Sequence, residues 1–374
     1  MSRESVPSYA RLLWRQYSYQ LPLVSASLAG LIIEATLAQR WSSWRFVPMA
    51  LVAACLIYFL LSTFSVYRSL FPHPAVAYSI CTGKTRDWFE FNACRQQEAR
   101  LKQSGIRWDA IQREFRIHRT DWTFVYESTL SEDYRDWIEL ARRMLVHFWN
   151  LPKRVEGVPI YHFFLIAPPT LVFALGAHVG RKVAYVVYHF VPSTKQPYVV
   201  VADTSHRDTS KGFIGLNRRV EEKDRQYIKI ALEQRALAGS KVIIVLDFTN
   251  HRFAGPFLGD MDVAEIIRIG HRDGIGHLPS AGWERLAHEI ASVMLEYCDR
   301  GTQIDLYINC PLALAFLIGA IVGPVQGLTL CEYNVYLQKS VRCFDIADRL
   351  IQGLSSPTAP GRLEAVPHSS PGQS

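Results

Sequence analysis

The sequence lacks the cysteine patterns that mark zinc sites and disulfide frameworks. It has 7 cysteines among 374 residues, and no two of them form a CxxC pair. Most lie in apolar runs, as free thiols of a reducing compartment do. The sequence therefore predicts no disulfide, no zinc site and no other metal site.

Catalytic motifs are also missing. No G-x-S-x-G turn and no Walker A run is present, and His288-Glu289 lacks the second histidine of a zincin. The triplet 271–273 (His-Arg-Asp) matches a kinase catalytic loop, but no Gly-rich loop or DFG accompanies it. Asp247 ends an apolar run, where a carboxylate usually caps the next turn. We therefore expect no enzyme; one alternative is a membrane-tethered nuclease or nucleotide hydrolase that uses Asp247 or residues 271–273. Another alternative is a passive scaffold or transporter accessory.

An excess of positive charge is present but not concentrated. Lys and Arg number 41 against 34 Asp and Glu, which gives a formal net charge of +7. Such a balance fits an anionic partner, either a membrane surface, a nucleotide or a nucleic acid. Because the basic residues are scattered, composition alone does not choose among these.

Two long apolar runs stand near the N-terminus, at Leu21–Ala38 and Phe46–Ser65. As helices they would be roughly 27 and 30 Å long, which matches a bilayer core. A cleaved signal peptide does not explain them, because some twenty mostly polar residues come first and a second run follows at once. A buried helical hairpin in a soluble core is the remaining alternative. We expect a transmembrane hairpin over residues 21–65, after a segment of residues 1–20.

Basic residues flank this hairpin on both sides, while its short connector holds only Arg40 and Arg45. By the positive-inside rule, both ends and the large C-terminal part should be cytoplasmic. The flanking basic residues are Arg3, Arg11, Arg15, Arg68, Lys84 and Arg86.

Glu34 interrupts the first apolar run, and a carboxylate at that depth is costly unless it is paired, protonated or facing water. One interpretation is that it reaches toward Arg40 at the outer interface. The other is that it faces a helix–helix seam or a pore in an oligomer. Small residues that permit close helix packing lie nearby, at Ser25, Ala26, Ala29 and Gly30.

The rest of the chain divides into three parts. Residues 66–130 form a mixed connector with a charged helix near 86–102 and a short strand near 122–126. Residues 131–352 form the main domain. Residues 353–374 are rich in Pro, Ser and Gly and should be disordered.

An internal repeat is the most informative feature of the main domain. Its copies cover about residues 131–190 and 281–336. Identical residues recur in the same order, and Tyr188 is placed opposite Tyr333. The matched pairs are Trp137 and Trp283, Pro168 and Pro311, Phe173 and Phe316, Gly176 and Gly319, and Gly180 and Gly323.

Each copy has the pattern of a βαβ unit. An amphipathic helix leads to an apolar strand, 160–166 or 304–308, of the kind buried on both faces in parallel sheets. Proline then opens a second helix, which runs to a glycine before another strand, 183–190 or 328–336. We also expect a strand over 241–247 after a helix over 219–238. Two such units predict a doubly wound, pseudo-symmetric α/β domain of Rossmann-like halves.

Ligands of such sheets bind beyond the carboxyl ends of the strands, where helix N-termini face anions. The repeat places two strand-exit turns on one such rim as quasi-equivalent anion sites, which suits a ligand with repeated phosphates. Basic side chains of nearby loops are further phosphate contacts, although each is more often a solvated surface charge. The candidate residues are Ala167, Pro168, Pro169, Thr170 and Phe173, Asn309, Cys310, Pro311 and Leu312, and Arg207, Lys211 and Arg252.

The repeated Pro-x-x-x-x-Phe-x-x-Gly helix and the stretch IDLYINCPLALAFLIGAIVGPVQGLTLCEYN resemble the SAVED domain. The resemblance covers about residues 137–347. It implies a fused pair of CARF-like units that binds a cyclic di-, tri- or tetranucleotide and needs no cofactor. The part carried over to this chain is limited to the two turns and the helices that follow them.

With its apolar hairpin, the chain resembles the transmembrane SAVED effectors of CBASS antiphage systems. That resemblance implies a partner cyclic-nucleotide synthase, homo-oligomerisation on ligand binding, and disruption of the bacterial inner membrane of an infected cell.

Overall fold

The computed structural model describes most of the chain after the predicted hairpin. The described residues are 73–128, 130, 132–151, 155, 158–180, 182–192, 197–205, 219–234, 241–249, 265–274, 282–334 and 339–348. Among these residues, none of the helices combines the length and apolar character needed to span a bilayer. The predictions for the hairpin over 21–65, for Glu34, for Arg207, Lys211 and Arg252, and for the tail after residue 352 lie outside the described residues.

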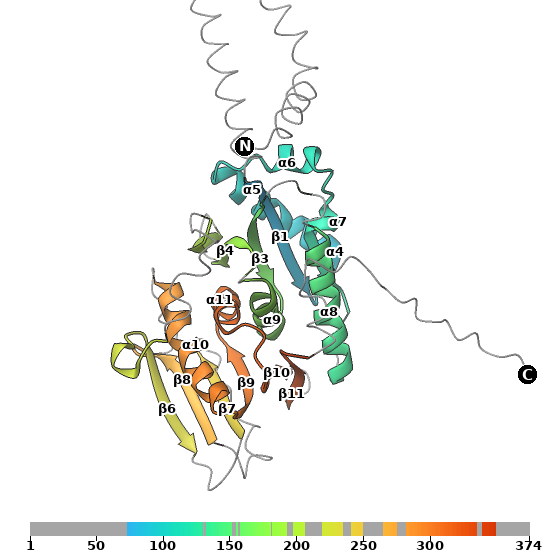
Figure 1. The fold of residues 1–374 in the computed structure, drawn as a ribbon. Helices are drawn as coiled ribbons and strands as arrows, with labels where there is room; N and C mark the ends of the chain where they lie inside the picture. Colours follow the sequence, from blue (N-terminus) through green and yellow to red (C-terminus); the bar gives the residue numbers. More distant parts are fainter. Residues whose placement is uncertain are drawn as a thin grey trace, which may run out of the picture.

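Two mixed β-sheets make up the domain (Figure 1). The first has the strand order β2-β1-β3-β4-β5, and the second has the order β11-β10-β9-β7-β8-β6. The first sheet contains β1 (Ala75–Thr82), β2 (Thr123–Tyr126), β3 (Ile160–Ile166), β4 (Ala184–Phe190) and β5 (Tyr198–Asp203). The second contains β6 (Ile228–Gln234), β7 (Lys241–Asp247), β8 (Glu265–His271), β9 (Gln303–Asn309), β10 (Leu328–Asn334) and β11 (Lys339–Asp345).

The central strands are parallel and buried on both faces, as their continuous apolar sequences predict. β3 pairs with β1 and β4, and β9 pairs with β7 and β10, all in parallel. The last strand of each half, β5 or β11, is antiparallel to its neighbour. The predicted α/β class and the predicted strands over 160–166 and 241–247 are therefore confirmed.

The five strands of the first sheet each correspond to a strand of the second, in which β6 is additional. Tyr161 of β3 pairs with Tyr185, and the matching Ile304 of β9 pairs with Leu328. The register shift between Val187 and Tyr188 in β4 recurs between Leu330 and Cys331 in β10, and the shifts fall at equivalent positions. Tyr188 thus matches Cys331, and the predicted match of Tyr188 with Tyr333 is wrong. Because side chains alternate with a period of two, an alignment displaced by two residues keeps the same buried face.

The structural repeat begins earlier in the chain than the sequence repeat does. β1 and β2, from the segment predicted to be a connector, occupy in the first sheet the places of β7 and β8 in the second. The predicted charged helix near 86–102 is confirmed, with a π-helical stretch inside it. The elements between β1 and β2 are α4 (Arg86–Phe89), η3 (Glu90–Cys94), α5 (Arg95–Gln103), α6 (Trp108–Glu114) and α7 (Arg119–Trp122).

The predicted helix over 219–238 is wrong. The structure has a short 3-10 turn, η6 (Glu222–Asp224), followed by the edge strand β6. The buried carboxylate of Glu289 accepts hydrogen bonds from the backbone N–H groups of Gln226, Tyr227 and Ile228, at 2.9, 2.8 and 3.2 Å. This contact from a distant helix holds the chain extended as it enters β6. Tertiary structure therefore overrides the local helix propensity of the segment.

Two apolar helices, α9 (Pro169–Val179) and α11 (Leu312–Val322), lie side by side between the sheets (Figure 1). Glycine permits this close approach: a Cβ at Gly176 would overlap the carbonyl oxygen of Phe316, and one at Gly319 would overlap that of Phe173. The two contacts are related by exchange of the repeats. A pseudo-twofold axis that relates the two repeats therefore passes between α9 and α11 in the core of the domain.

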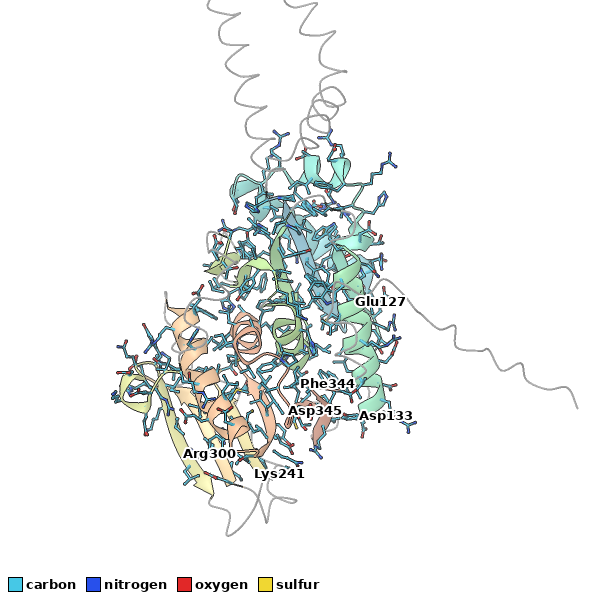
Figure 2. The ribbon with its side chains drawn as sticks, viewed as in Figure 1. Glu127, Asp133, Lys241, Arg300, Phe344 and Asp345 are labelled. Carbon is cyan, nitrogen blue, oxygen red and sulfur yellow. The ribbon has the colours of Figure 1, made fainter. Side chains whose placement is uncertain are left out.

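Each of the two outer helices packs against the sheet of the other half. The helix α8 (Tyr134–Asn150) packs against β11 of the second sheet, and α10 (Trp283–Asp299) packs against β5 of the first. In Figure 2, Asp133, whose side chain accepts from Arg135 N at the start of α8, lies near Asp345 of β11. Each half thus supplies a helix that covers the other, which joins the halves into one body.

Candidate functional site

The two predicted strand-exit turns have the same backbone shape. β3 ends at Ile166, and α9 begins at Pro169 after the N-cap residue Pro168, with φ −53° and ψ 140°. β9 ends at Asn309, and α11 begins after the N-cap residue Pro311, with φ −55° and ψ 140°. The first turn of each helix leaves backbone N–H groups without intrahelical partners.

The structure brings these turns to one rim. Thr170, in the first turn of α9, donates a hydrogen bond from Oγ1 to Oε2 of Glu332 over 2.9 Å. Glu332 directly follows Cys331, which pairs with Tyr307 of β9, two residues before Asn309. The helix of the first repeat therefore begins over the carboxyl end of the second sheet, beside the turn of the second repeat. We call this region the inter-repeat rim. That a ligand contacts it stays a prediction.

A polar network holds the second turn in place. Asn309 pairs with Asp247, the last residue of β7, and donates from Nδ2 to its Oδ1 over 3.1 Å. Arg268 of β8 donates to Oδ2 of the same carboxylate over 2.9 Å, and Thr249 Oγ1 donates to Oδ1 of Asn309. The Asp247 side chain is 7% exposed and that of Arg268 is 31% exposed. A guanidinium is thus oriented by a buried carboxylate and remains open to solvent at the rim.

The turn after β3 is instead in contact with an acid, Glu332 of β10. Burial raises the pKa of Glu332 to about 7, although hydrogen bonds from the side chain and backbone of Thr170 act to lower it. A carboxylate is favourable at a helix N-terminus, where it compensates the positive end of the helix dipole. The anion position predicted for a ligand phosphate at α9 is therefore already in contact with a carboxyl group from the other repeat.

The repeats differ chemically at this point. The strand register places His189 of β4 where β10 has Glu332, and the helix alignment places Ala313 where α9 has Thr170. The His189 ring packs on Trp283, with centroids 5.1 Å apart, and burial lowers the pKa of the imidazole. The predicted equivalence of the two anion sites is therefore wrong in chemistry, although it is right in backbone shape.

Most other residues predicted for the site line the turns, with one exception. Ala167, Pro168 and Pro169 are partly buried at the first turn, as are Asn309, Pro311 and Leu312 at the second, while Thr170 and Cys310 are buried. Burial raises the pKa of the Cys310 thiol, which stays protonated. Phe173 of α9 is fully buried, and its backbone carbonyl lies against Gly319 of α11. Phe173 therefore packs the core and does not reach the rim.

Arg268 and Glu332 are the rim residues that the sequence prediction missed. Both are charged residues in the interior of strands that are mainly apolar, EIIRIGH and LTLCEYN. A charge within a buried strand is costly unless it is paired or lies at an exposed end. That interruption is the signal that could have identified them.

The residues considered for catalysis make hydrogen bonds within the fold. His271 Nδ1 accepts from the backbone N–H of Asp273 over 3.2 Å, and Arg272 donates to the carbonyl of Arg225 over 3.0 Å, which stabilises the turn after β8. Asp247 is held by Arg268 and Asn309. Within the described residues, no group of three or more His, Cys, Asp and Glu side chains is placed to hold a metal ion.

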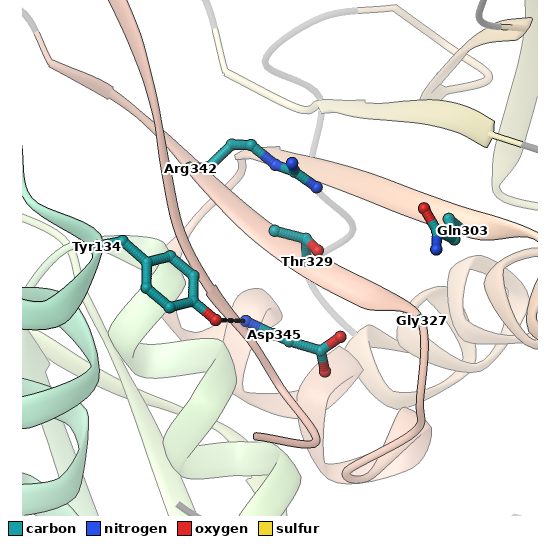
Figure 3. Close-up of a pocket in the computed structure, with 6 residues that line it drawn as sticks. All are labelled: Tyr134, Gln303, Gly327, Thr329, Arg342 and Asp345. Atoms are coloured by element: carbon teal, nitrogen blue, oxygen red, sulfur yellow. Dashed lines mark hydrogen bonds between the residues drawn. The ribbon is translucent and has the colours of Figure 1, made fainter. Parts of the chain in front are cut away.

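A polar pocket of about 320 Å³ lies at the opposite end of the second sheet (Figure 3). Gln303 begins β9 and Gly327 precedes β10, so this pocket is at the amino ends of the strands, away from the inter-repeat rim. Tyr134 accepts from the backbone N–H of Asp345 over 3.5 Å, and Thr329 and Arg342 complete the lining. The pocket thus lies where α8 packs against β11.

This fold is that of a duplicated α/β module with a rim shared by its halves. Residues 150–339, half of the chain, match the family model described as the SMODS-associated and fused to various effectors sensor domain, SAVED. The chain belongs to the SAVED family. No curated protein sequence matches it significantly.

Solved structures of SAVED/CARF-domain receptors are similar to the chain at low sequence identity. The Cap4 receptor of Acinetobacter baumannii with 3'3'3'-cAAA is 9% identical, with a TM-score of 0.41, and with 2'3'3'-cAAA it is 11% identical, with a TM-score of 0.42. The Cap4 receptor of Moraxella osloensis is 8% identical, with a TM-score of 0.39. The matches cover 77% of this chain but only 55% of each Acinetobacter chain and 53% of the Moraxella chain.

Proposed function

We propose that this protein is a membrane-anchored effector that binds a cyclic oligonucleotide through its SAVED domain, oligomerises on binding and disrupts the bacterial inner membrane in antiphage defence. The observation that carries the proposal is the inter-repeat rim, where the start of α9 contacts Glu332 of β10, the strand next to β9, in a domain of the SAVED family. Such a rim is where doubly wound folds bind nucleotides.

The rim supplies the groups that a phosphate ligand needs. The N-terminus of α11 presents backbone N–H groups. Arg268 is on β8, which is separated from β9 by β7. An arginine fixed by a carboxylate binds phosphate with less loss of side-chain entropy than a free one. The ligands named with the Acinetobacter receptors are cyclic trinucleotides of adenylate, so this class is the first to test.

The membrane part of the proposal rests on the two apolar runs over 21–38 and 46–65. A hairpin of two helices cannot enclose a water-filled path, because several helices must surround it. Assembly of several copies is therefore required for a lesion. A ligand that binds the assembled form more tightly than the dispersed form drives assembly, and the difference between the two affinities sets how far the equilibrium shifts.

We also propose that the protein acts by binding and assembly, without chemistry of its own. Asp247, the acid best placed at the rim, is engaged by both Arg268 and Asn309. The synthesis of the ligand then belongs to a separate cyclic-nucleotide synthase. A membrane-tethered nuclease or nucleotide hydrolase is the alternative, and turnover of the ligand during incubation would reveal it.

The decisive experiment uses the full chain, purified in detergent and reconstituted in liposomes. Cyclic di-, tri- and tetranucleotides are titrated by calorimetry, particle mass is followed by light scattering, and leakage of a trapped dye reports the lesion. We expect one ligand class to bind, to raise the mass and to release the dye. Binding without any gain in mass or leakage would contradict the effector mechanism and leave only a sensor.

A further inference from the structure

The contact between Thr170 and Glu332 makes the inter-repeat rim unequal at its two ends. Thr170 belongs to the first repeat and Glu332 to the second, and their hydrogen bond spans 2.9 Å. Glu332 also accepts from the backbone N–H of Thr170. A phosphate at the start of α9 would have to use the N–H and hydroxyl donors that this carboxyl group occupies.

We infer that Glu332 determines the orientation of the ligand, because it closes the α9 turn to phosphate and leaves the α11 turn as the phosphate subsite. This inference rests on the proposed binding of a cyclic oligonucleotide.

The charges around the two turns support this assignment. At the α11 turn, the partly exposed guanidinium of Arg268 is linked through the carboxylate of Asp247 to Asn309, while Ala313 and His189 replace Thr170 and Glu332. At the α9 turn, the nearest titratable group in the described part of the chain is the carboxyl group of Glu332 itself. Like charges at short range in a partly desolvated site repel by several times the thermal energy.

The same contact makes affinity depend on pH. The pKa of Glu332 is raised to about 7 by burial, so this group changes charge across neutrality. The group that faces it from α9 is Thr170, which does not titrate. The group that faces it from β11 is the Cys343 thiol, whose pKa is raised well above neutrality, mainly by its own burial, so the thiol stays uncharged. Among the described residues, Glu332 is therefore the group that titrates at this end of the rim.

The sign follows from the charges. A phosphodiester stays ionised throughout the neutral range, whereas Glu332 is mostly neutral at pH 6 and mostly ionised at pH 8. Repulsion is therefore weaker at pH 6, and the affinity of the wild-type protein should fall as the pH rises from 6 to 8. Glu332→Gln removes the charge and keeps an oxygen that can accept from Thr170.

The test measures the affinity of the full chain in detergent for cyclic triadenylate, cyclic di-AMP and cyclic tetra-adenylate at pH 6 and pH 8. For a ligand that binds, Glu332→Gln should bind about tenfold more tightly than wild type at pH 8, with little difference at pH 6. The matched control is Glu139→Gln, which removes one carboxylate from the exposed face of α8 and should leave both affinities unchanged.

Two results would overturn the inference while leaving the proposed function intact. One is equal affinity of wild type and Glu332→Gln at pH 8, and the other is loss of binding in the variant, which would make Glu332 an essential ligand contact. If neither protein binds any probe at either pH, both the inference and the proposed function are contradicted.

Discussion

Gly176 lies directly against the backbone carbonyl of Phe316, and this contact is mirrored by Gly319 and Phe173. The two helices thus approach so closely that their backbones touch at the centre of the domain. Any side chain at either glycine must push the repeats apart. The spacing of the inter-repeat rim is therefore set by two residues in the core of the domain.

Gly176→Leu should destabilise the domain by about 3 kcal/mol, because an added side chain has no space and the opposing atom is backbone. Thermal unfolding followed by circular dichroism measures the loss. Gly105→Asn is the control, since nothing lies within 4 Å of a Cβ there, although its φ of +77° carries a small cost. Equal melting temperatures for the wild type and Gly176→Leu would contradict the described helix contact.

Removal of residues 1–71 should abolish toxicity and preserve ligand binding. The first strand begins at Ala75, so the truncated chain keeps every strand of both sheets. Cell viability after expression with the synthase measures the first effect, and calorimetry on the purified domain measures the second. Full toxicity of the truncated protein would rule out the membrane mechanism.

Arg268→Gln should weaken binding of the cognate cyclic oligonucleotide by about 2 kcal/mol, or roughly 30-fold, because a charge-assisted hydrogen bond is lost. Arg342→Gln is the matched control: Arg342 also pairs with a buried aspartate, Asp305 at 3.1 Å, but lies on the last strand of the second sheet, by the pocket at its amino end. If both variants bind as wild type does, the phosphate subsite lies elsewhere.

Leu312→Trp should also weaken binding, since a large ring at the first residue of α11 obstructs the N–H groups of that turn. Thr170→Trp should have a smaller effect on phosphate binding, because Glu332 already covers the α9 turn. Affinities of the two variants, compared at pH 8, decide the matter. A larger loss of affinity for Thr170→Trp than for Leu312→Trp would mean that the α9 turn contributes more to phosphate binding than the α11 turn does.

Glu34→Gln should alter dye leakage and leave ligand-driven oligomerisation unchanged. The carboxylate lies within the first apolar run, whereas assembly is expected to depend on the soluble domain. Light scattering and liposome leakage separate the two effects on the same sample. A defect in assembly would place Glu34 in a helix–helix seam instead of a water path.

The fold could be predicted from the sequence wherever pattern and burial agree. The strand over 160–166 was located to the residue because its apolar run ends at a proline. The strand β6 was missed because its extended form depends on Glu289, 61 residues away from Ile228. Sequence patterns describe local preference, and a contact of that range is decided by tertiary structure.

The candidate site was predicted in outline only. The turns followed from the repeat, since parallel strands place their carboxyl ends on the same edge. The network of Asp247, Arg268 and Asn309 depends on which strands are neighbours, and the order β9-β7-β8 is not the order of the chain. Phe173 was assigned to the site because it follows the turn, whereas the close approach of α9 and α11 buries it.

The matching register shifts in β4 and β10 show how closely one backbone is used twice. A symmetric pair of separate chains built on that backbone would carry the same side chain at both turns. Joining the halves in one polypeptide removes this restriction, so one turn can hold Thr170 against Glu332 while the other holds Ala313. Covalent fusion thereby allows a pseudo-symmetric backbone to bind the two sides of an asymmetric ligand differently.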